Sequence, residues 1–463
     1  MTLAYSVIRE ALAAQPLFED KTWQISPEAW GIRAHELKEI ESIGLACLEF
    51  YRAMEFLYIR SSEGKNILRN GKLETAWVAD YLNRGKPDQL IKHGLSPKLR
   101  NNQPMIIRPD LLITETGFAL TEIDSVPGGI GLTAFLNRLY ASETTIGHDD
   151  RMLDLFIESL SALRPDKENP IIGIVVSDEA ATYRPEMEWL AAELQERGKR
   201  VYCLHTSDLL PIGDRLCADI DGNPEELDIV YRFWEMFDIP NLPIMDAVFN
   251  AIEKTPLVVT PPMRTFQEEK MNLALFHHPR LDPFWREQLS RRSLRVLQKI
   301  IPRSWIMDPV DLPPNAVLDA PLIGGQPIHN WMQLAEASKK ERNLIVKLSG
   351  FHENAWGARS VIFGSDASKN EWEDGIRDVI KEASVSLSVL QNYEKPIRRT
   401  HPLYRAEGAV RDSQVRVRLC PYYFVKGDEV ELGGILSTAC PADKKIIHGM
   451  RDAAMLPSRV VQD

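Results

Sequence analysis

The sequence predicts a mixed fold that combines α+β and α/β parts, and three observations support this. Within residues 1 to about 100, apolar side chains recur at spacings of three, four and seven, the period of an amphipathic helix. Two β-rich runs around Gly117 then form a hairpin pattern. From 168 to 262, short apolar runs alternate with a helical segment. That order is typical of a small parallel sheet with covering helices.

These changes of pattern divide the chain into four predicted segments. They are a helical N-terminal region (1–100), a hairpin followed by a helix (101–167), the parallel-sheet region (168–262) and a C-terminal part (263–463). The last part begins helical and proline-rich, returns to strands, and ends in a long hairpin with its turn at Lys426-Gly427-Asp428. No GxGxxG loop follows the first strand of the parallel region, so a dinucleotide fold has no motif support.

Composition excludes several classes of protein. The formal net charge of the 463 residues is −11 and no run of Lys and Arg stands out, which argues against nucleic-acid binding. No stretch approaches the roughly 20 apolar residues of a membrane span, and the first residues lack the apolar core of a secretion signal. The five cysteines form no CxxC pair, so we expect reduced thiols and a cytoplasmic protein. No pattern indicates an oligomeric state.

Three acidic residues and an arginine gather in the predicted hairpin. With residues 115–117 as the loop, Asp110 lies directly across from Glu122, and Asp124 and Arg108 lie on the same face. Opposed carboxylates are destabilising and raise each other's pKa, and a bound divalent cation removes that conflict. All-oxygen ligands suit Mg²⁺ or Mn²⁺. Alternatively, the hairpin face is solvated and Arg108 pairs its charges.

A second candidate site surrounds Lys347. It lies in the hydrophobic run NLIVKLSG, just before a loop that contains Gly350, Asn354 and Gly357. A lysine in such a strand is costly unless its ammonium meets an anion, and a glycine-containing loop can place backbone N–H groups against phosphate oxygens. The alternative is an edge-strand lysine that extends to the surface. The Walker pattern GxxxxGK[ST] is absent.

Together these two motifs resemble the ATP-grasp enzymes, and most of all the glutathionylspermidine synthetase branch, a circularly permuted form in which the metal-binding acids precede the ATP lysines. RPD, followed twelve residues after Asp110 by ExD, is similar to the branch's R-x-D…E-x-N signature. The resemblance implies an ATP-grasp fold, with the 168–262 sheet as the pre-ATP-grasp domain that helps form the substrate cleft. It implies that Asp110, Glu122 and Asp124 hold Mg²⁺ and that Arg108 stabilises the transferring phosphoryl group.

The resemblance also implies a set of ATP-binding residues. The VKLSGFHENAWG segment resembles the branch's K-P-x-x-G-R-x-G-x-N loop, although Leu348 replaces the proline. EEKMNLALFHHP resembles the segment that carries the earlier ATP lysine, and the QNY segment resembles the hinge whose backbone meets the adenine. The predicted nucleotide ligands are therefore Lys270, Lys347, Gly350, Asn354, Gly357, Gln391 and Tyr393.

The final hairpin resembles the closing strands of the family. In it Arg416 or Arg418 is a second phosphate contact, and we choose Arg418. Two features depart from the branch: Asp124 stands where asparagine is usual, and no separate amidase domain precedes the hairpin.

The implied reaction is the ATP- and Mg²⁺-dependent joining of a small-molecule carboxylate to an amine, through an acyl phosphate. It needs no covalent nucleophile, and no Ser/His/Asp or Cys/His constellation stands out. Three alternatives remain. They are a small-molecule kinase of the same fold, a carboxylate metal hydrolase that uses no nucleotide, and a nucleotide-binding protein without catalysis.

Overall fold

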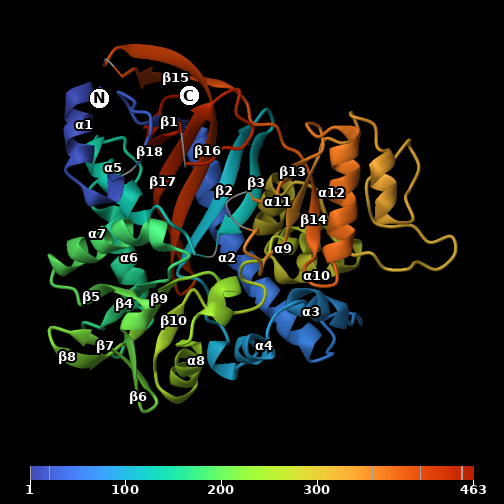
Figure 1. Cartoon of the computed structure of the whole chain (residues 1–463), viewed down its shortest axis with the longest axis horizontal. Coiled ribbons are helices and arrows are strands. Elements are labelled where there is room, and N and C mark those ends of the chain that lie inside the picture. The colour runs from blue at the N-terminus through green and yellow to red at the C-terminus, as the bar shows by residue number, and fades with distance from the viewer. Residues whose placement is uncertain (1, 20, 125, 356–358, 407, 450–451) are drawn as a thin grey trace. The chain divides into compact units, whose positions relative to one another are not determined.

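The computed structural model describes residues 2–19, 21–124, 126–355, 359–406, 408–449 and 452–463 (Figure 1). Their contacts group the chain into two compact units. Unit 1 comprises Met1–Leu48, Pro97–Met263 and Pro396–Asp463, and unit 2 comprises Glu49–Ser96 and Arg264–Lys395. Each unit is therefore assembled from stretches that are distant in the chain. The division into four consecutive segments stays a prediction.

The largest sheet of unit 1 has the strand order β1-β18-β17-β16-β2-β3, and β15 pairs with β16. Its strands are β1 (Trp30–Arg33), β2 (Ile106–Thr114), β3 (Gly117–Asp124), β15 (Arg399–Tyr404), β16 (Val410–Lys426), β17 (Glu429–Pro441) and β18 (Ala454–Val461). The predicted final hairpin is confirmed, since Lys426 pairs with Glu429 across a two-residue turn. Gly427 takes a φ of +64° there, which glycine adopts without a steric cost. The long strand β16 lies beside β2 and so carries C-terminal side chains to the acidic hairpin.

The predicted parallel sheet of unit 1 is confirmed, with the order β10-β9-β4-β5. Its strands are β4 (Ile172–Val176), β5 (Val201–His205), β9 (Ile229–Phe233) and β10 (Val258–Thr260). Helix α7 (Arg184–Gln195) connects β4 to β5, and α8 (Met245–Lys254) connects β9 to β10. Every residue of β4 and β9 is buried, as the continuous apolar runs predicted. The connections leave β4 and β9 in opposite directions, and ligands of open parallel sheets bind at such a switch point.

Further elements complete unit 1. Helices α1 (Tyr5–Ala13), α5 (Ile130–Leu139) and α6 (Arg151–Ser161) pack their apolar faces in one core with residues of both sheets. A small antiparallel sheet consists of β6 (Leu209–Ile212), β7 (Arg215–Ile220) and β8 (Asn223–Glu226).

Unit 2 surrounds a smaller antiparallel sheet with the order β11-β14-β12-β13. The strands are β11 (Ser304–Met307), β12 (Leu344–Leu348), β13 (Ile362–Phe363) and β14 (Ser388–Asn392). Its helices are α3 (Ala76–Asn83), α4 (Asp88–Gly94), α9 (Met271–His277), α10 (Asp282–Gln288), α11 (Arg291–Ile300), α12 (Lys369–Glu382) and the second half of α2 (Ala34–Ser62). Trp331 and Trp372 pack with Val346 and Leu390 in its core. Within the described ranges, no helix combines the length and the apolar character that a membrane crossing requires.

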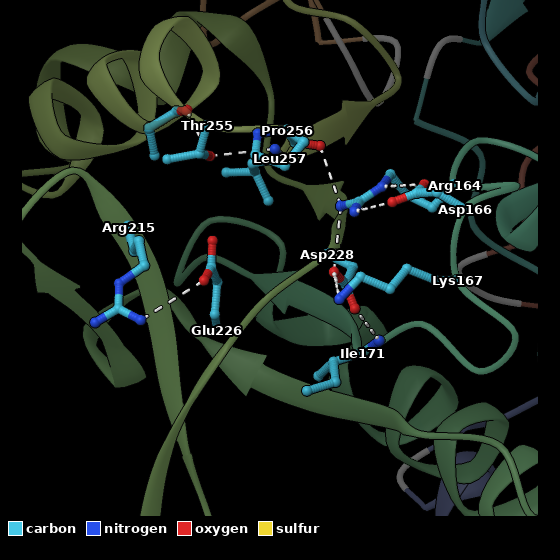
Figure 2. A network of polar contacts seen from close by, with 11 residues as sticks. Arg164, Asp166, Lys167, Ile171, Arg215, Glu226, Asp228, Thr255, Pro256 and Leu257 are labelled. Carbon is cyan, nitrogen blue, oxygen red and sulfur yellow. Dashed lines mark hydrogen bonds and ion pairs between the residues drawn. The ribbon is translucent and has the colours of Figure 1, made fainter.

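A polar network holds the amino ends of the parallel strands (Figure 2). Asp228, just before β9, accepts a hydrogen bond from the N–H of Ile171, just before β4, at 2.9 Å, and pairs with Arg164 at 3.2 Å. Arg164 also donates to the carbonyl of Pro256, near β10, at 3.2 Å, and pairs with Asp166 at 2.7 Å. One buried arginine–carboxylate pair thus connects the starts of three strands, at the edge opposite the switch point.

We expect Asp228→Ala to lower the free energy of unfolding by about 3 kcal/mol, because it removes the acceptor of the Ile171 N–H and the buried one of the two carboxylates that pair with Arg164. Urea unfolding measures this loss. Asp166→Ala is the matched control, because Asp166 pairs with the same arginine but is 60% exposed, and we expect a clearly smaller loss from it. Equal losses in the two variants would contradict this account.

Candidate functional site

The acidic hairpin has the predicted register. β2 and β3 are antiparallel, Asp110 lies opposite Glu122, and Arg108 lies opposite Asp124. The predicted pairing of Asp110 with Glu122 is therefore confirmed, and Asp124 and Arg108 lie on the same face.

The route to this register differs from the expected one. Thr114 pairs with Gly117, so the turn has two residues rather than three. A β-bulge at Thr121 then shifts the register by one residue between Leu111 and Asp110. The Thr121 hydroxyl donates to the Asp110 carbonyl at 3.2 Å. Because a one-residue slip would turn Glu122 and Asp124 to the other face, the bulge keeps the acids together.

Asp110 is only 1% exposed and has close polar partners on both carboxylate oxygens. Arg418 of β16 pairs with Oδ2 at 2.8 Å, and Arg108 lies 3.2 Å from Oδ1. The thiol of Cys420, two residues beyond Arg418, donates to Oδ1 at 3.3 Å. Of the two candidate arginines, Arg418 is the one beside Asp110, whereas Arg416 donates to the carbonyl of Lys444 at 3.2 Å.

Arg108 joins the two strands of the hairpin electrostatically. It lies 2.5 Å from Asp124 in addition to its contact with Asp110, and it donates to the carbonyl of Gly128 at 3.2 Å. Burial disfavours the charge of Arg108, but Asp124 and Asp110 outweigh it and raise its pKa well above the ordinary value. Burial raises the pKa of Asp124, and Arg108 opposes that shift. Arg108 and Asp124 therefore each stabilise the charged form of the other.

The fit of the acids to a metal ion is mixed. Their hard carboxylate oxygens suit Mg²⁺, and Glu122 and Asp124 are partly exposed. However, among the described residues no group of three or more His, Cys, Asp and Glu side chains is arranged to hold a metal ion. Asp110 already engages two guanidinium groups. The metal assignment of the three acids therefore stays a prediction.

A buried glutamate that the sequence did not single out supports the adjacent glycine turn. Glu186, near the start of α7, accepts from the N–H groups of Gly129 and Gly131 at 3.1 and 2.9 Å. These amides belong to the N-terminus of α5, where a negative charge is favoured. The carbonyl of Gly128 accepts from Tyr422 at 2.7 Å and from Arg108. Glu186 thus orders the turn that orients Arg108.

Orphaned polar groups gather near the carboxyl ends of the parallel strands. The hydroxyl of Tyr231 is buried and has no hydrogen-bond partner among the residues that the structure describes. Burial raises the pKa of Tyr231, and Asp124 and Glu186 raise it further, so it lies within electrostatic reach of the hairpin. The side-chain polar atoms of Ser177, Trp234 and Thr260 are likewise buried and have no hydrogen-bond partner among the described residues. Sequence reasoning missed this set, because only the paired strands bring it to one edge.

In unit 2, Lys347 lies on an inner strand, because β12 pairs with both β14 and β13. Its side chain is buried and its ammonium donates to the amide oxygen of Gln391 at 3.0 Å. The amide nitrogen of Gln391 in turn donates to Ser304 at 3.0 Å. The alternative of an edge-strand lysine that extends to the surface is therefore wrong.

Lys270 lies beside the loop that follows Lys347. Its ammonium donates to the carbonyl of Ala355 at 2.7 Å, and its backbone N–H donates to the carbonyl of Ser349 at 2.9 Å. The exposed Asn354 belongs to the same loop, whereas Gly357 lies outside the described residues. The structure thus brings the predicted lysine of the α9 start to the predicted loop, although their role toward a nucleotide stays a prediction.

The backbone of the predicted adenine hinge already has partners. Tyr393 donates its N–H to the carbonyl of Asn343 at 3.0 Å and accepts from the Asn343 side chain at 3.3 Å. Gln391 pairs within the sheet with Ser304 and Ile345. The adenine contact of this segment stays a prediction.

These observations define a protein of mixed α+β class, with an acidic hairpin in its largest sheet and a separate small parallel sheet. No family model matches the chain, and no curated protein matches it. Over the full length of both chains, it superposes on a glutathione synthetase-like effector (GSS30) from Globodera pallida, in its apo form, with a TM-score of 0.55 and 10% identity. A proposed gamma-glutamylcysteine synthetase from Methylobacillus flagellatus KT matches 88% of each chain at 12% identity, with a TM-score of 0.43. The first likeness, at 10% identity, shows a shared fold alone. The predicted mixed fold of α+β and α/β parts is confirmed, and the ATP-grasp assignment stays a prediction.

Burial raises the pKa of Glu186 to about 7, above its ordinary value, although the backbone amides oppose the shift. A carboxyl with a raised pKa stabilises the fold most fully when protonated. We therefore expect the free energy of unfolding to fall as the pH rises from about 4 through 7, by up to about 3 kcal/mol from this group. Urea unfolding of the wild type and Glu186→Gln across pH 4.5–8.5 measures it. The difference between the two proteins must change with pH in this window; a constant difference would contradict the assignment.

Proposed function

We propose that this chain is an ATP- and Mg²⁺-dependent carboxylate–amine ligase that forms an amide or peptide-like bond through an acyl phosphate. The observation that carries the proposal is the buried Arg108–Asp110–Arg418 cluster, on a hairpin of a fold shared with a protein described as glutathione synthetase-like. Glutathione synthetases are ligases of this kind. The order of the motifs, with acids before lysines, supports a glutathionylspermidine synthetase-like branch.

The two arginines have the properties that phosphoryl transfer requires. A guanidinium offers a rigid fork of N–H donors that fits phosphate oxygens. Arg108 and Arg418 are held in place by Asp110, and Arg108 also by Gly128. Donors that are fixed in advance stabilise charge without reorganisation during the reaction. We assign to the two arginines the stabilisation of the negative charge that develops on the transferred phosphoryl group and on the acyl phosphate.

Glu122 and Asp124, together with Asp110, are the proposed ligands of Mg²⁺, or of Mn²⁺ in its place. When bound, such an ion neutralises charge on the ATP phosphates. Glu122 and Asp124 present partly exposed oxygens on one face of the hairpin. Asp110, which contacts both guanidinium groups, is the third proposed ligand.

The proposed ATP ligands belong to unit 2. Lys347 and Lys270 donate to the uncharged oxygens of Gln391 and Ala355, which phosphate oxygens can replace. Further proposed ligands are Gly350, Asn354 and Gly357 of the loop after β12, and Gln391 and Tyr393 of the hinge.

The reaction follows from these roles. A substrate carboxylate oxygen attacks the γ-phosphorus, and ADP leaves. The amine nitrogen then attacks the acyl carbon, phosphate departs with the electrons of the broken C–O bond, and the nitrogen loses a proton. We place the small-molecule acid and amine at the carboxyl edge of the parallel sheet, where Tyr231, Ser177, Trp234 and Thr260 offer buried polar groups. The cytoplasmic location stays a prediction from the free thiols.

We expect Glu122→Gln and Asp110→Asn each to lower ATP turnover by about 100-fold or more, because each removes a charge that the transferring phosphoryl group and its cation require. ADP release measures turnover, and near-UV circular dichroism checks that the variants are folded. Glu115→Gln is the control, since Glu115 is an exposed acid in the turn of the same hairpin. Wild-type turnover in both site variants would refute the metal assignment.

A ligase should release ADP in proportion to amide formed, and only when both an acid and an amine are present. We expect hydroxylamine, used as a surrogate amine with a panel of carboxylic acids, to trap the acyl phosphate as a hydroxamate. Coupled ADP release and the ferric hydroxamate colour measure both products. ADP release that depends on a hydroxyl compound and needs no amine would indicate a kinase. If Mg-ATP fails to bind in a calorimetric titration, both nucleotide-dependent functions are excluded.

A further inference from the structure

A charged pair is buried in unit 2, and neither of its residues was assigned a role by sequence. The ammonium of Lys86 lies 2.6 Å from Oε1 of Glu269, and their side chains are 2% and 3% exposed. Lys86 also donates to the carbonyl of Leu82, at the C-terminal end of α3, at 2.7 Å. Such a pair is expensive to desolvate, and well-packed apolar residues are often equally stable in its place.

The other oxygen of Glu269 holds the loop that follows β12. The hydroxyl of Ser349 donates to Oε2 of Glu269 and accepts from the N–H of Met271 at 2.9 Å. The carbonyl of Ser349 accepts from the N–H of Lys270 at 2.9 Å. Glu269 and Ser349 thus join the start of α9 to the end of β12 through both side-chain and backbone contacts.

Gly350 permits this close approach. A Cβ at Gly350 would lie 2.5 Å from the carbonyl of Glu268 and 2.8 Å from Oε1 of Glu269. Lys86 also lies 5.7 Å from the ring centre of Phe351, the next residue of the loop. The glycine is therefore required by packing against the Glu269 segment, before any contact with a phosphate is considered.

Each segment that this network joins carries a proposed ATP lysine. Lys270 directly follows Glu269, and Lys347 precedes Ser349 by two residues. The ammonium of Lys270 also reaches Ala355 of the same loop. A shift of the Glu269–Ser349 contact would therefore move both lysines.

We propose that Lys86, Glu269 and Ser349 are positioning residues of the nucleotide site, which fix the two segments from which Lys270 and Lys347 contact ATP. The assignment rests on the proposed function. The positioning role adds to the proposed nucleotide site three residues that do not themselves contact the nucleotide. It also explains why a lysine and a glutamate are buried together at this place.

The test compares Glu269→Gln, Ser349→Ala and the double variant Lys86→Met with Glu269→Leu. Amide hydrogen exchange of residues 349–355 without nucleotide reports the order of the loop, and calorimetric titration with Mg-ATP gives Kd. We expect faster exchange and an increase in Kd of about 10- to 100-fold in all three, with kcat at saturating ATP less affected. The double variant removes both charges, so its stability recovers toward wild type while its Kd stays high.

Glu55→Gln is the matched control. Glu55 is a buried carboxylate of the same unit, 8% exposed, and pairs with Arg264 at 2.7 Å. It should lower stability and leave Kd for Mg-ATP unchanged. Wild-type exchange and wild-type Kd in the double variant would overturn the positioning role while the wild type still binds Mg-ATP. A wild type that does not bind Mg-ATP would overturn the proposed function, and the positioning role with it.

Discussion

The carboxylate of Asp110, buried between Arg108 and Arg418, is the interaction on which the hairpin depends. A carboxylate that is 1% exposed is tolerated only if charge and hydrogen bonds replace the lost water. Arg108 of β2 and Arg418 and Cys420 of β16 supply them, so the partners come from two strands. The register of β2 against β3 and against β16 therefore has to be correct to one residue, and the bulge at Thr121 is the local cost of that requirement.

Backbone groups of the glycine turn connect Arg108 of the hairpin to helix α7 of the parallel sheet in unit 1. Arg108 shares the carbonyl of Gly128 with Tyr422, and Gly128 adjoins the amides that Glu186 accepts. Gly129 has no room for a side chain, because a Cβ would lie 2.3 Å from the Tyr422 hydroxyl, and its φ is +91°. A buried acid on α7 thus orients an arginine on β2 without touching it.

Sequence periodicity correctly predicted the features of the fold that depend on neighbouring residues. The period-2 run around Asp110, the parallel strands and the final turn at Gly427 were all correct, because each depends on neighbours along the chain. The two-residue turn with its bulge was not foreseen, since a three-residue loop produces the same pairing of acids. Glu186 and Tyr231 were missed for another reason. Their significance comes from contacts between distant segments, and neither has a distinctive local pattern.

The charged groups around the hairpin nearly balance one another. The three acids Asp110, Glu122 and Asp124 carry three formal negative charges, and Arg108 and Arg418 carry two positive charges. The formal net charge is therefore 2 − 3 = −1, so the arginines nearly neutralise the acids. The ion pairs that replace water around the buried carboxylate of Asp110 also fix the two guanidinium groups that the proposed reaction uses. Stability and the proposed chemistry thus depend on the same contacts, so loss of the Asp110 carboxylate would remove an ion-pair partner from both arginines at once.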